Sequence, residues 1–201
     1  MQIKKSIHCV LFYFFCSLFF LNQTAAADDK TSAVEFLKTN LDSVFTVLQN
    51  KDLSQEAKTS KVDEIVTPLF DFQRMAMLSL GKKYWPALSP EQKERFTDLF
   101  VERLRHFYLN KLTAYTDEKI IFEAPMEVKK RVRIPTQLIS TNNQIEMLYK
   151  LYPVNNTWKI YDVEIQGVSI IRSYRAQFTE ILQKGTIDDL FQKMEKPLAN
   201  E

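Results

Sequence analysis

Four polar side chains could support acid–base chemistry if the fold brings them together. They are two carboxylates, Asp71 and Asp162, and two phenols, Tyr149 and Tyr161. A carboxylate base paired with a tyrosine oxyanion donor is an arrangement that isomerases use for proton transfer. Strand alternation weakens the set, because it places Asp162 on the face opposite Tyr161. Asp71 opens an expected helix, where the helix dipole already explains an acid. We therefore expect no catalytic residue, and an enzyme that depends on Asp71 or Tyr161 remains an alternative.

The N-terminal residues have the three parts of a secretory signal peptide. Two lysines precede an uncharged apolar run over residues 7–21, and three alanines at 25–27 offer a small-residue cleavage site. The run is shorter than the roughly 20 residues that a membrane-spanning helix needs. We expect residues 1–27 to be removed on export and residues 28–201 to form one domain.

The composition of residues 28–201 excludes several classes of function. Both cysteines, Cys9 and Cys16, precede residue 28, so we expect no disulfide, thiolate or cysteine metal site. His106 is the only histidine after residue 28, and we expect it to be a partly exposed helix residue and not a metal ligand or part of a catalytic triad. Without the two early lysines, 25 basic residues face 25 acidic ones. A neutral chain lacks the basic excess of a nucleic-acid binder.

Four helices are expected in the first half of this region. The first follows Ser32 as N-cap, and its apolar face holds Leu37, Leu41, Val44 and Leu48. The second begins near Ser54 and ends before Pro68. The others are a short helix over 71–80 with Gly81 as C-cap, and a long helix from a capping box at 89–92 to about residue 115.

Strands and two more helices are expected in the second half. Turn signals separate four alternating segments, at 119–123, 129–139, 145–152 and 158–166. After Gly167 the apolar period becomes helical, and residues 186–189 cap a last short helix. Helices, then an antiparallel meander, then helices predict an α+β fold, with a curved sheet of about four strands packed by helices on one face.

The segment over 158–178 carries a family resemblance. It reads W-K-I-Y-D-V-E-I-Q-G-V-S-I-I-R-S-Y-R-A-Q-F, which resembles the signature of the MlaC family, the periplasmic phospholipid carriers of the Mla transport system, once called toluene-tolerance proteins. The resemblance covers most of residues 28–201 in the family's order. It extends to P-L-F-D-F at 68–72, Leu80-Gly81, Tyr84-Trp85, and S-P-E-Q at 89–92 followed by Phe96, Phe100 and Leu104.

The resemblance implies a fold and a function. The fold would be a cone similar to nuclear transport factor 2 (NTF2-like), with additional N- and C-terminal helices. The function would be that of a monomeric periplasmic carrier that encloses phospholipid acyl chains, leaves the head group in solvent and uses no cofactor. Its partners would be an MCE-domain protein of an inner-membrane ABC transporter and an outer-membrane lipoprotein–porin complex, and its role the maintenance of outer-membrane lipid asymmetry. No phosphate-binding glycine loop is present, so energy would come from a partner.

Alternation and helix periodicity select the side chains expected to contact lipid. Periodicity does not separate a hollow interior from a filled one, so a structural adaptor with a filled core is a second alternative. We expect a charge introduced at Val168 or Ile171 to abolish lipid binding. The expected lipid-binding residues are Met75, Leu78, Phe100, Leu104, Phe107, Tyr108, Met147, Tyr149, Tyr161, Val163, Ile165, Val168 and Ile171.

Basic residues alternate along the second expected strand. Lys129, Arg131 and Arg133 would share one face of it. A solvated outer face with an edge protected by charge is the favoured interpretation. Contact with anionic head groups or with an acidic docking partner is the other. Arg172 and Arg175, near the expected pocket mouth, have the same two interpretations.

Overall fold

The computed structural model describes residues 29–109, 119–141 and 143–196. The expected signal peptide at 1–27 and the expected helical residues 110–115 lie outside these ranges. Within them, none of the helices combines the length and the apolar character that crossing a bilayer requires.

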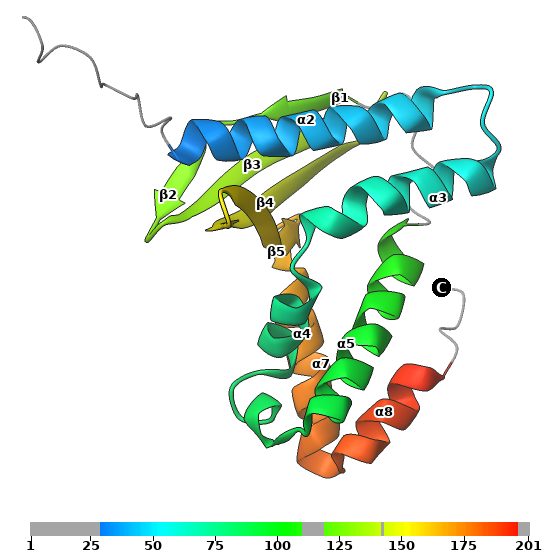
Figure 1. Cartoon of the computed structure of the whole chain (residues 1–201), viewed down its shortest axis with the longest axis vertical. Coiled ribbons are helices and arrows are strands. Elements are labelled where there is room, and N and C mark those ends of the chain that lie inside the picture. The colour runs from blue at the N-terminus through cyan, green and yellow to red at the C-terminus, as the bar shows by residue number, and fades with distance from the viewer. Residues whose placement is uncertain (1–28, 110–118, 142, 197–201) are drawn as a thin grey trace, which may run out of the picture.

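Helices occupy both ends of the described chain, with the sheet between them (Figure 1). The N-terminal helical elements are α2 (Asp29–Gln49), α3 (Gln55–Val66), the 3-10 turn η1 (Thr67–Leu69), α4 (Phe72–Leu80), the 3-10 turn η2 (Trp85–Ala87), α5 (Pro90–Leu104) and the π-helical segment η3 (Arg105–Leu109). The C-terminal helices are α7 (Ile170–Lys184) and α8 (Ile187–Glu195).

The predicted caps set most of the helix ends. Asp71 accepts from the Arg74 N–H at the start of α4, and Gly81 ends that helix with a φ of 85°, which a residue without Cβ adopts at little cost. Capping boxes open α5 at Ser89 and α8 at Thr186. The prediction for Ser32 is wrong, because α2 begins at Asp29. The Ser32 hydroxyl instead accepts a hydrogen bond of 2.8 Å from the indole N–H of Trp158.

The sheet is antiparallel and has two short strands besides the four expected ones. The expected strands are β1 (Lys119–Phe122), β3 (Arg131–Ile139), β4 (Gln144–Val154) and β5 (Thr157–Ile165). The additional ones are β2 (Met126–Val128), which pairs with β3, and β6 (Val168–Ser169), which pairs with β5. The strand order is β1-β3-β4-β5-β6.

The β2–β3 connection changes the expected arrangement of basic residues. Lys129 and Lys130 have positive φ values and form the turn before β3. The prediction that Lys129 alternates in a strand with Arg131 and Arg133 is therefore wrong. Antiparallel register instead pairs Val128 with Arg131, and Met126 with Arg133, so exposed apolar and basic side chains share the outer face.

A β-bulge interrupts the alternation of β5. Lys150 pairs with Asp162 but the next residue, Leu151, pairs with Ile160. Tyr161 is the extra residue between them, and such a residue leaves the side-chain alternation. The prediction that Tyr161 shares a face with Val163 and Ile165 is therefore wrong. Its ring packs edge-on against Tyr152, with 5.9 Å between ring centroids, and the Arg131 guanidinium lies 5.2 Å from its centroid.

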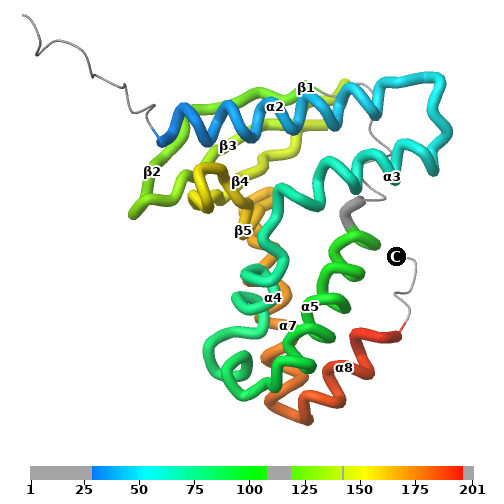
Figure 2. The backbone as a smooth tube through the Cα atoms, viewed as in Figure 1, coloured from blue at the N-terminus to red at the C-terminus, as the bar shows by residue number. Residues whose placement is uncertain are grey.

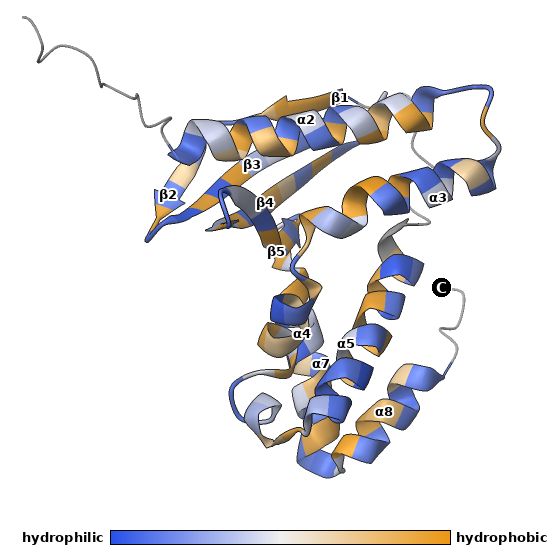
Figure 3. Cartoon of the chain, viewed as in Figure 1, coloured by the Kyte–Doolittle hydropathy of each residue, from blue (hydrophilic) through white to orange (hydrophobic). Residues whose placement is uncertain are grey.

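The helices form two groups. In Figures 1 and 2, α2 runs along the sheet with α3 beside it, while α4, α5, α7 and α8 gather on the other side of β5. Apolar positions recur between polar ones along these helices (Figure 3), as amphipathic packing requires. The first half of α2, with Ala33 and Leu37, joins the main core, whereas Val44, Leu48 and Val62 form a small separate core between α2 and α3.

Interlocking aromatic rings fill the interior between α5 and α7. Phe96 meets Phe178 edge-on at 5.3 Å between centroids, and Phe100 meets Tyr174 edge-on at 5.1 Å. Phe96 and Phe100 are fully buried. Edge-to-face contacts stabilise such rings beyond the effect of area burial, so these helices form a well-packed support for the sheet.

Truncating one of these rings should destabilise the whole protein. Phe100→Ala is expected to lower the free energy of unfolding by about 3–5 kcal/mol, because it opens a cavity in a filled core. Chemical denaturation followed by circular dichroism measures the change. Ile121→Ala is the control at an exposed position, with an expected change of less than about 0.5 kcal/mol. Equal effects of the two substitutions would contradict this assignment of the core.

Candidate functional site

A cavity of about 400 Å³ lies between the inner face of the sheet and the helices. Twenty of the described residues line it; seventeen are apolar or aromatic, and the other three are Asp63, Thr67 and Arg105. The apolar lining comes from α2 (Leu37, Leu41, Val44), from the segment of α3, η1 and α4 (Val66, Leu69, Phe70, Phe72, Met75), from α5 and α7 (Leu104, Ile170) and from the sheet (Leu138, Ile145, Met147, Tyr149, Ile160, Val163, Ile165).

Strand register brings the sheet residues to one face. Met147 pairs with Ile165 and Tyr149 with Val163, and paired residues of antiparallel strands project from the same side. The bulge at Tyr161 then returns Ile160 to that side, although three positions separate it from Val163. The irregularity of β5 thus adds one apolar side chain to the cavity wall.

Six of the residues predicted to bind lipid line this cavity. Two lie on helices and four on the strands β4 and β5. They are Met75, Leu104, Met147, Tyr149, Val163 and Ile165.

The other predicted residues lie elsewhere. Phe100 and Ile171 are buried in the main core, and Leu78 packs against it. Val168 pairs with Ile165 across the β5–β6 turn, but it is 59% exposed and is not among the lining residues. Tyr161 lies outside the cavity lining for the reason given above. Phe107 and Tyr108 belong to η3. Phe107 is half-buried, and the side chain of Tyr108 is not among those that the structure describes.

Sequence reasoning missed the contribution of the first helices to the wall. Periodicity predicts an apolar helix face with Leu37, Leu41 and Val44, but it does not say which element that face meets. The contribution of Phe70 and Ile160 was also missed. A parallel bridge joins these two residues and places η1 against β5, and this contact between distant segments has no local signal.

Asp71 and Asp162 both have structural partners. The backbone N–H of Arg74 donates to one Asp71 oxygen, and the Tyr152 hydroxyl donates to the other. Burial, followed by this bond to Asp71, raises the pKa of Tyr152. Asp71 therefore caps α4 and binds Tyr152 of β4, and it is not among the residues that line the cavity.

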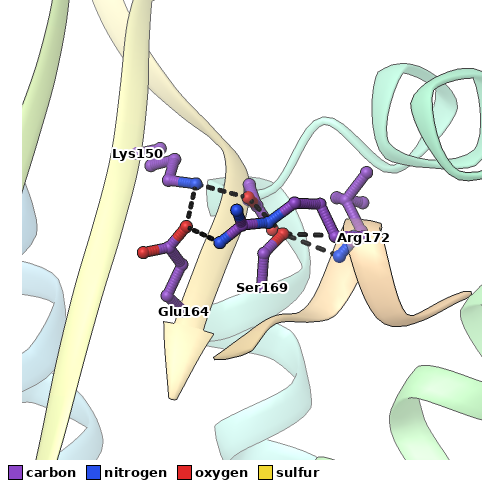
Figure 4. A network of polar contacts seen from close by, with 6 residues as sticks. Lys150, Glu164, Ser169 and Arg172 are labelled. Atoms are coloured by element: carbon purple, nitrogen blue, oxygen red, sulfur yellow. Dashed lines mark hydrogen bonds and ion pairs between the residues drawn. The ribbon is translucent and has the colours of Figure 1, made fainter. Parts of the chain in front are cut away.

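Asp162 is buried and lies at the centre of a polar network, of which Figure 4 labels Lys150, Glu164, Ser169 and Arg172. Lys150 Nζ lies 2.8 Å from one carboxylate oxygen, and the Ser169 hydroxyl donates to the same oxygen at 2.8 Å. The backbone N–H of Ile171 donates to the other at 3.2 Å. Glu164 extends the network, accepting from Lys150 at 2.6 Å and from Arg172 at 2.7 Å. The network joins the sheet to the first turn of α7 and gives Arg172 a structural partner.

The chemistry available at the cavity is that of an apolar container. Tyr149 contributes a hydroxyl to this lining, and that hydroxyl donates to the Met147 sulfur at 3.7 Å. Burial raises the pKa of Tyr149, which keeps the phenol neutral. Among the described residues, no group of three or more histidine, cysteine, aspartate or glutamate side chains could hold a metal ion.

Comparison with known proteins identifies the family. The sequence profile of the MlaC protein family matches residues 38–196. The chain belongs to the MlaC family. It is 27% identical to the "intermembrane phospholipid transport system binding protein MlaC" of Haemophilus influenzae, over 97% of this chain and 94% of that protein. It is 26% identical to the "toluene tolerance protein ttg2D" of Pseudomonas putida, over 63% of this chain and 60% of that one.

A solved structure has the same fold as this MlaC-family chain. It is the phospholipid-binding protein of Ralstonia solanacearum in complex with a phospholipid. The TM-score is 0.74 at 23% sequence identity, over 82% of this chain and 95% of that one. The predicted α+β fold and the predicted family are both confirmed.

The buried phenol predicts a pH dependence of stability. The pKa of a tyrosine in an unfolded chain is about 10, whereas burial raises the pKa of Tyr149 in the folded chain. Its stabilising contribution is therefore complete below about pH 10 and is lost as the pH rises from there towards the folded-state pKa. The loss should approach about 1.4 kcal/mol per pH unit, the value for one proton.

Denaturation of the wild type and of Tyr149→Phe at a series of pH values between 8 and 11 tests this prediction. The variant should lose stability less steeply above about pH 10, because it lacks the ionising group. Identical slopes would show that the phenol ionises as easily in the folded as in the unfolded chain.

Proposed function

We propose that this chain is a phospholipid carrier that encloses acyl chains in the cavity between α2, η1 and the sheet. The observation that carries the proposal is the cavity itself, with seventeen apolar or aromatic residues among twenty. The names of two relatives specify phospholipid binding and intermembrane phospholipid transport, and both support the same ligand. The cavity volume of about 400 Å³ lies in the range of ligand sites.

Solvation explains why such a ligand needs a carrier. Burial of one methylene is worth about 0.8 kcal/mol, so two acyl chains of roughly 30 methylenes would cost on the order of 24 kcal/mol in water. A wall of leucine, isoleucine, valine, phenylalanine and methionine side chains offsets a similar amount. Transfer between a bilayer and the carrier is then nearly balanced, and net direction must come from partners that bind the loaded and empty states differently.

The finer proposal places the carrier in the periplasm. Residues 1–27 would be removed on export, and residues 28–201 would act there as a single-domain monomer without cofactor. Its partners would be an MCE-domain protein of an inner-membrane ABC transporter and an outer-membrane lipoprotein–porin complex. The transported phospholipid would serve the lipid asymmetry of the outer membrane. Membership in the MlaC family and the relative from an intermembrane transport system support this assignment.

The site supports binding and release without a covalent step. Asp71 and Asp162 have cap and ion-pair partners that account for both carboxylates. Tyr149 is the only member of the predicted acid–base set in the described cavity lining, and its raised pKa disfavours proton release. The unfilled volume likewise favours a carrier over an adaptor with a filled core.

A pair of identical substitutions at two valines tests the carrier. Val163 is buried in the cavity wall, whereas Val168 is 59% exposed outside it. Val163→Asp should abolish co-purification of phospholipid, because a carboxylate would face the acyl chains without a partner. Val168→Asp should retain it, contrary to the expectation from sequence. Native mass spectrometry of residues 28–201 purified from the periplasm, followed by lipid extraction, gives the lipid-to-protein ratio.

A second variant separates lost binding from lost folding. Val163→Phe fills part of the cavity without adding a charge, and it should lower the lipid-to-protein ratio while the circular dichroism spectrum stays that of the wild type. A wild-type protein that releases no stoichiometric lipid on unfolding would refute the carrier and favour the adaptor. Lipid retained by folded Val163→Asp would refute the placement of the cavity.

A further inference from the structure

Among the described residues, the polar side chains of the cavity wall form one cluster. Asp63 lies on α3, Thr67 opens η1, and Arg105 opens η3. Arg105 Nε donates to Asp63 Oδ1 at 2.9 Å, and a terminal guanidinium nitrogen donates to the Thr67 hydroxyl at 3.2 Å. The Thr67 hydroxyl donates to the same Asp63 oxygen at 3.0 Å. All three polar lining residues therefore contact one another.

This cluster lies where the cavity wall reaches solvent. The side chain of Arg105 is 44% exposed and that of Asp63 33% exposed. The neighbouring Leu104 is buried and lines the same cavity. The wall thus changes from apolar to polar within one residue of the chain. We call Asp63, Thr67 and Arg105 the polar rim.

A phospholipid has the same division between apolar and polar parts. Its acyl chains require an apolar enclosure, and its phosphodiester carries a negative charge on oxygens that accept hydrogen bonds. Arginine presents several N–H donors in a planar fork that matches phosphate oxygens. We propose that Arg105 binds the phosphate of the carried phospholipid at the polar rim, and that Asp63 occupies the same guanidinium when the phosphate is absent. The proposal rests on the carrier function proposed above.

The contacts of Asp63 suit a partner that can be exchanged. Only Nε of Arg105 and Oδ1 of Asp63 form the ion pair, so the bond is single and not forked. An ion pair with this exposure contributes little to stability, because solvent screens both charges. A phosphodiester has the same sign of charge and can accept two parallel bonds. Replacement of the carboxylate by the phosphate therefore costs little and leaves the arginine charge neutralised in both states.

The backbone at Arg105 also differs from that of the preceding helix. The α-helix α5 ends at Leu104, and the π-helical segment η3 begins at Arg105. Short π-helical segments inside or after α-helices frequently lie at functional sites. This irregularity begins at the residue that separates the apolar wall from the polar rim, which is consistent with a role in ligand contact.

The other role for these residues is a structural link between α3 and η3. Opposite changes of charge distinguish the two roles. Both Arg105→Gln and Asp63→Asn break the ion pair, so a purely structural link predicts similar effects on lipid binding. Phosphate binding predicts opposite effects, because Arg105→Gln removes the phosphate ligand whereas Asp63→Asn removes its competitor.

Two lipids with the same dioleoyl chains provide the test. Residues 28–201 are equilibrated with vesicles containing phosphatidylglycerol or diacylglycerol, which lacks the phosphate, and bound lipid is measured by native mass spectrometry. Arg105→Gln should weaken binding of phosphatidylglycerol about tenfold, equivalent to about 1.4 kcal/mol, and leave diacylglycerol unchanged. Asp63→Asn should strengthen binding of phosphatidylglycerol, and Arg105→Lys should have an intermediate effect because it keeps the charge without the fork.

Arg133→Gln is the matched control, because Arg133 is an exposed arginine of β3 outside the cavity lining. It should bind both lipids as the wild type does. Equal weakening of both lipids by Arg105→Gln, or weakening of phosphatidylglycerol by Asp63→Asn, would overturn the phosphate assignment and support the structural link. A wild type that binds neither lipid would instead refute the carrier function itself.

Discussion

The buried carboxylate of Asp162 connects the two halves of the structure. It accepts hydrogen bonds from Lys150 in the sheet, from Ser169 at the cap of α7 and from the backbone of Ile171. A carboxylate at this depth requires its partners, because removal of one partner from a buried pair costs several kcal/mol. The direction in which α7 leaves the sheet is therefore constrained. Ile170, which lies between Ser169 and Ile171 in the chain, is part of the cavity wall, so the network also positions a lining side chain.

The two helix groups use apolar residues differently. Between α5 and α7, aromatic rings interlock and Phe96 and Phe100 have no exposed surface. Between α2 and the sheet, side chains of similar character surround a volume of about 400 Å³. Protein interiors are normally packed to the density of organic crystals. A hollow interior therefore needs rigid surroundings, and the aromatic core supplies them on the side of β5.

Local signals in the sequence were sufficient for most elements. The capping box at residues 89–92, the cap at residues 186–189 and the glycine at 81 predicted helix ends that the structure contains. The bulge at Tyr161 was not predictable in this way. The sequence of one strand does not show which of its residues will lack a partner on the neighbouring strand. The polar rim depends on a contact between Asp63 and Arg105, which lie 42 positions apart. Such contacts arise from packing, so periodicity led to only six of the twenty described lining residues.

The helix α2 belongs to two different cores. Its first half packs in the main core through Ala33 and Leu37, and the indole of Trp158 holds Ser32. Its second half packs through Val44 and Leu48 against α3. Leu37, Leu41 and Val44 face the cavity between these two attachments. A helix keeps its shape through its own backbone hydrogen bonds. In mechanical terms, α2 is anchored near both ends, so it can span the cavity between them without a filled interior beneath it. The hollow can therefore exist before any ligand fills it.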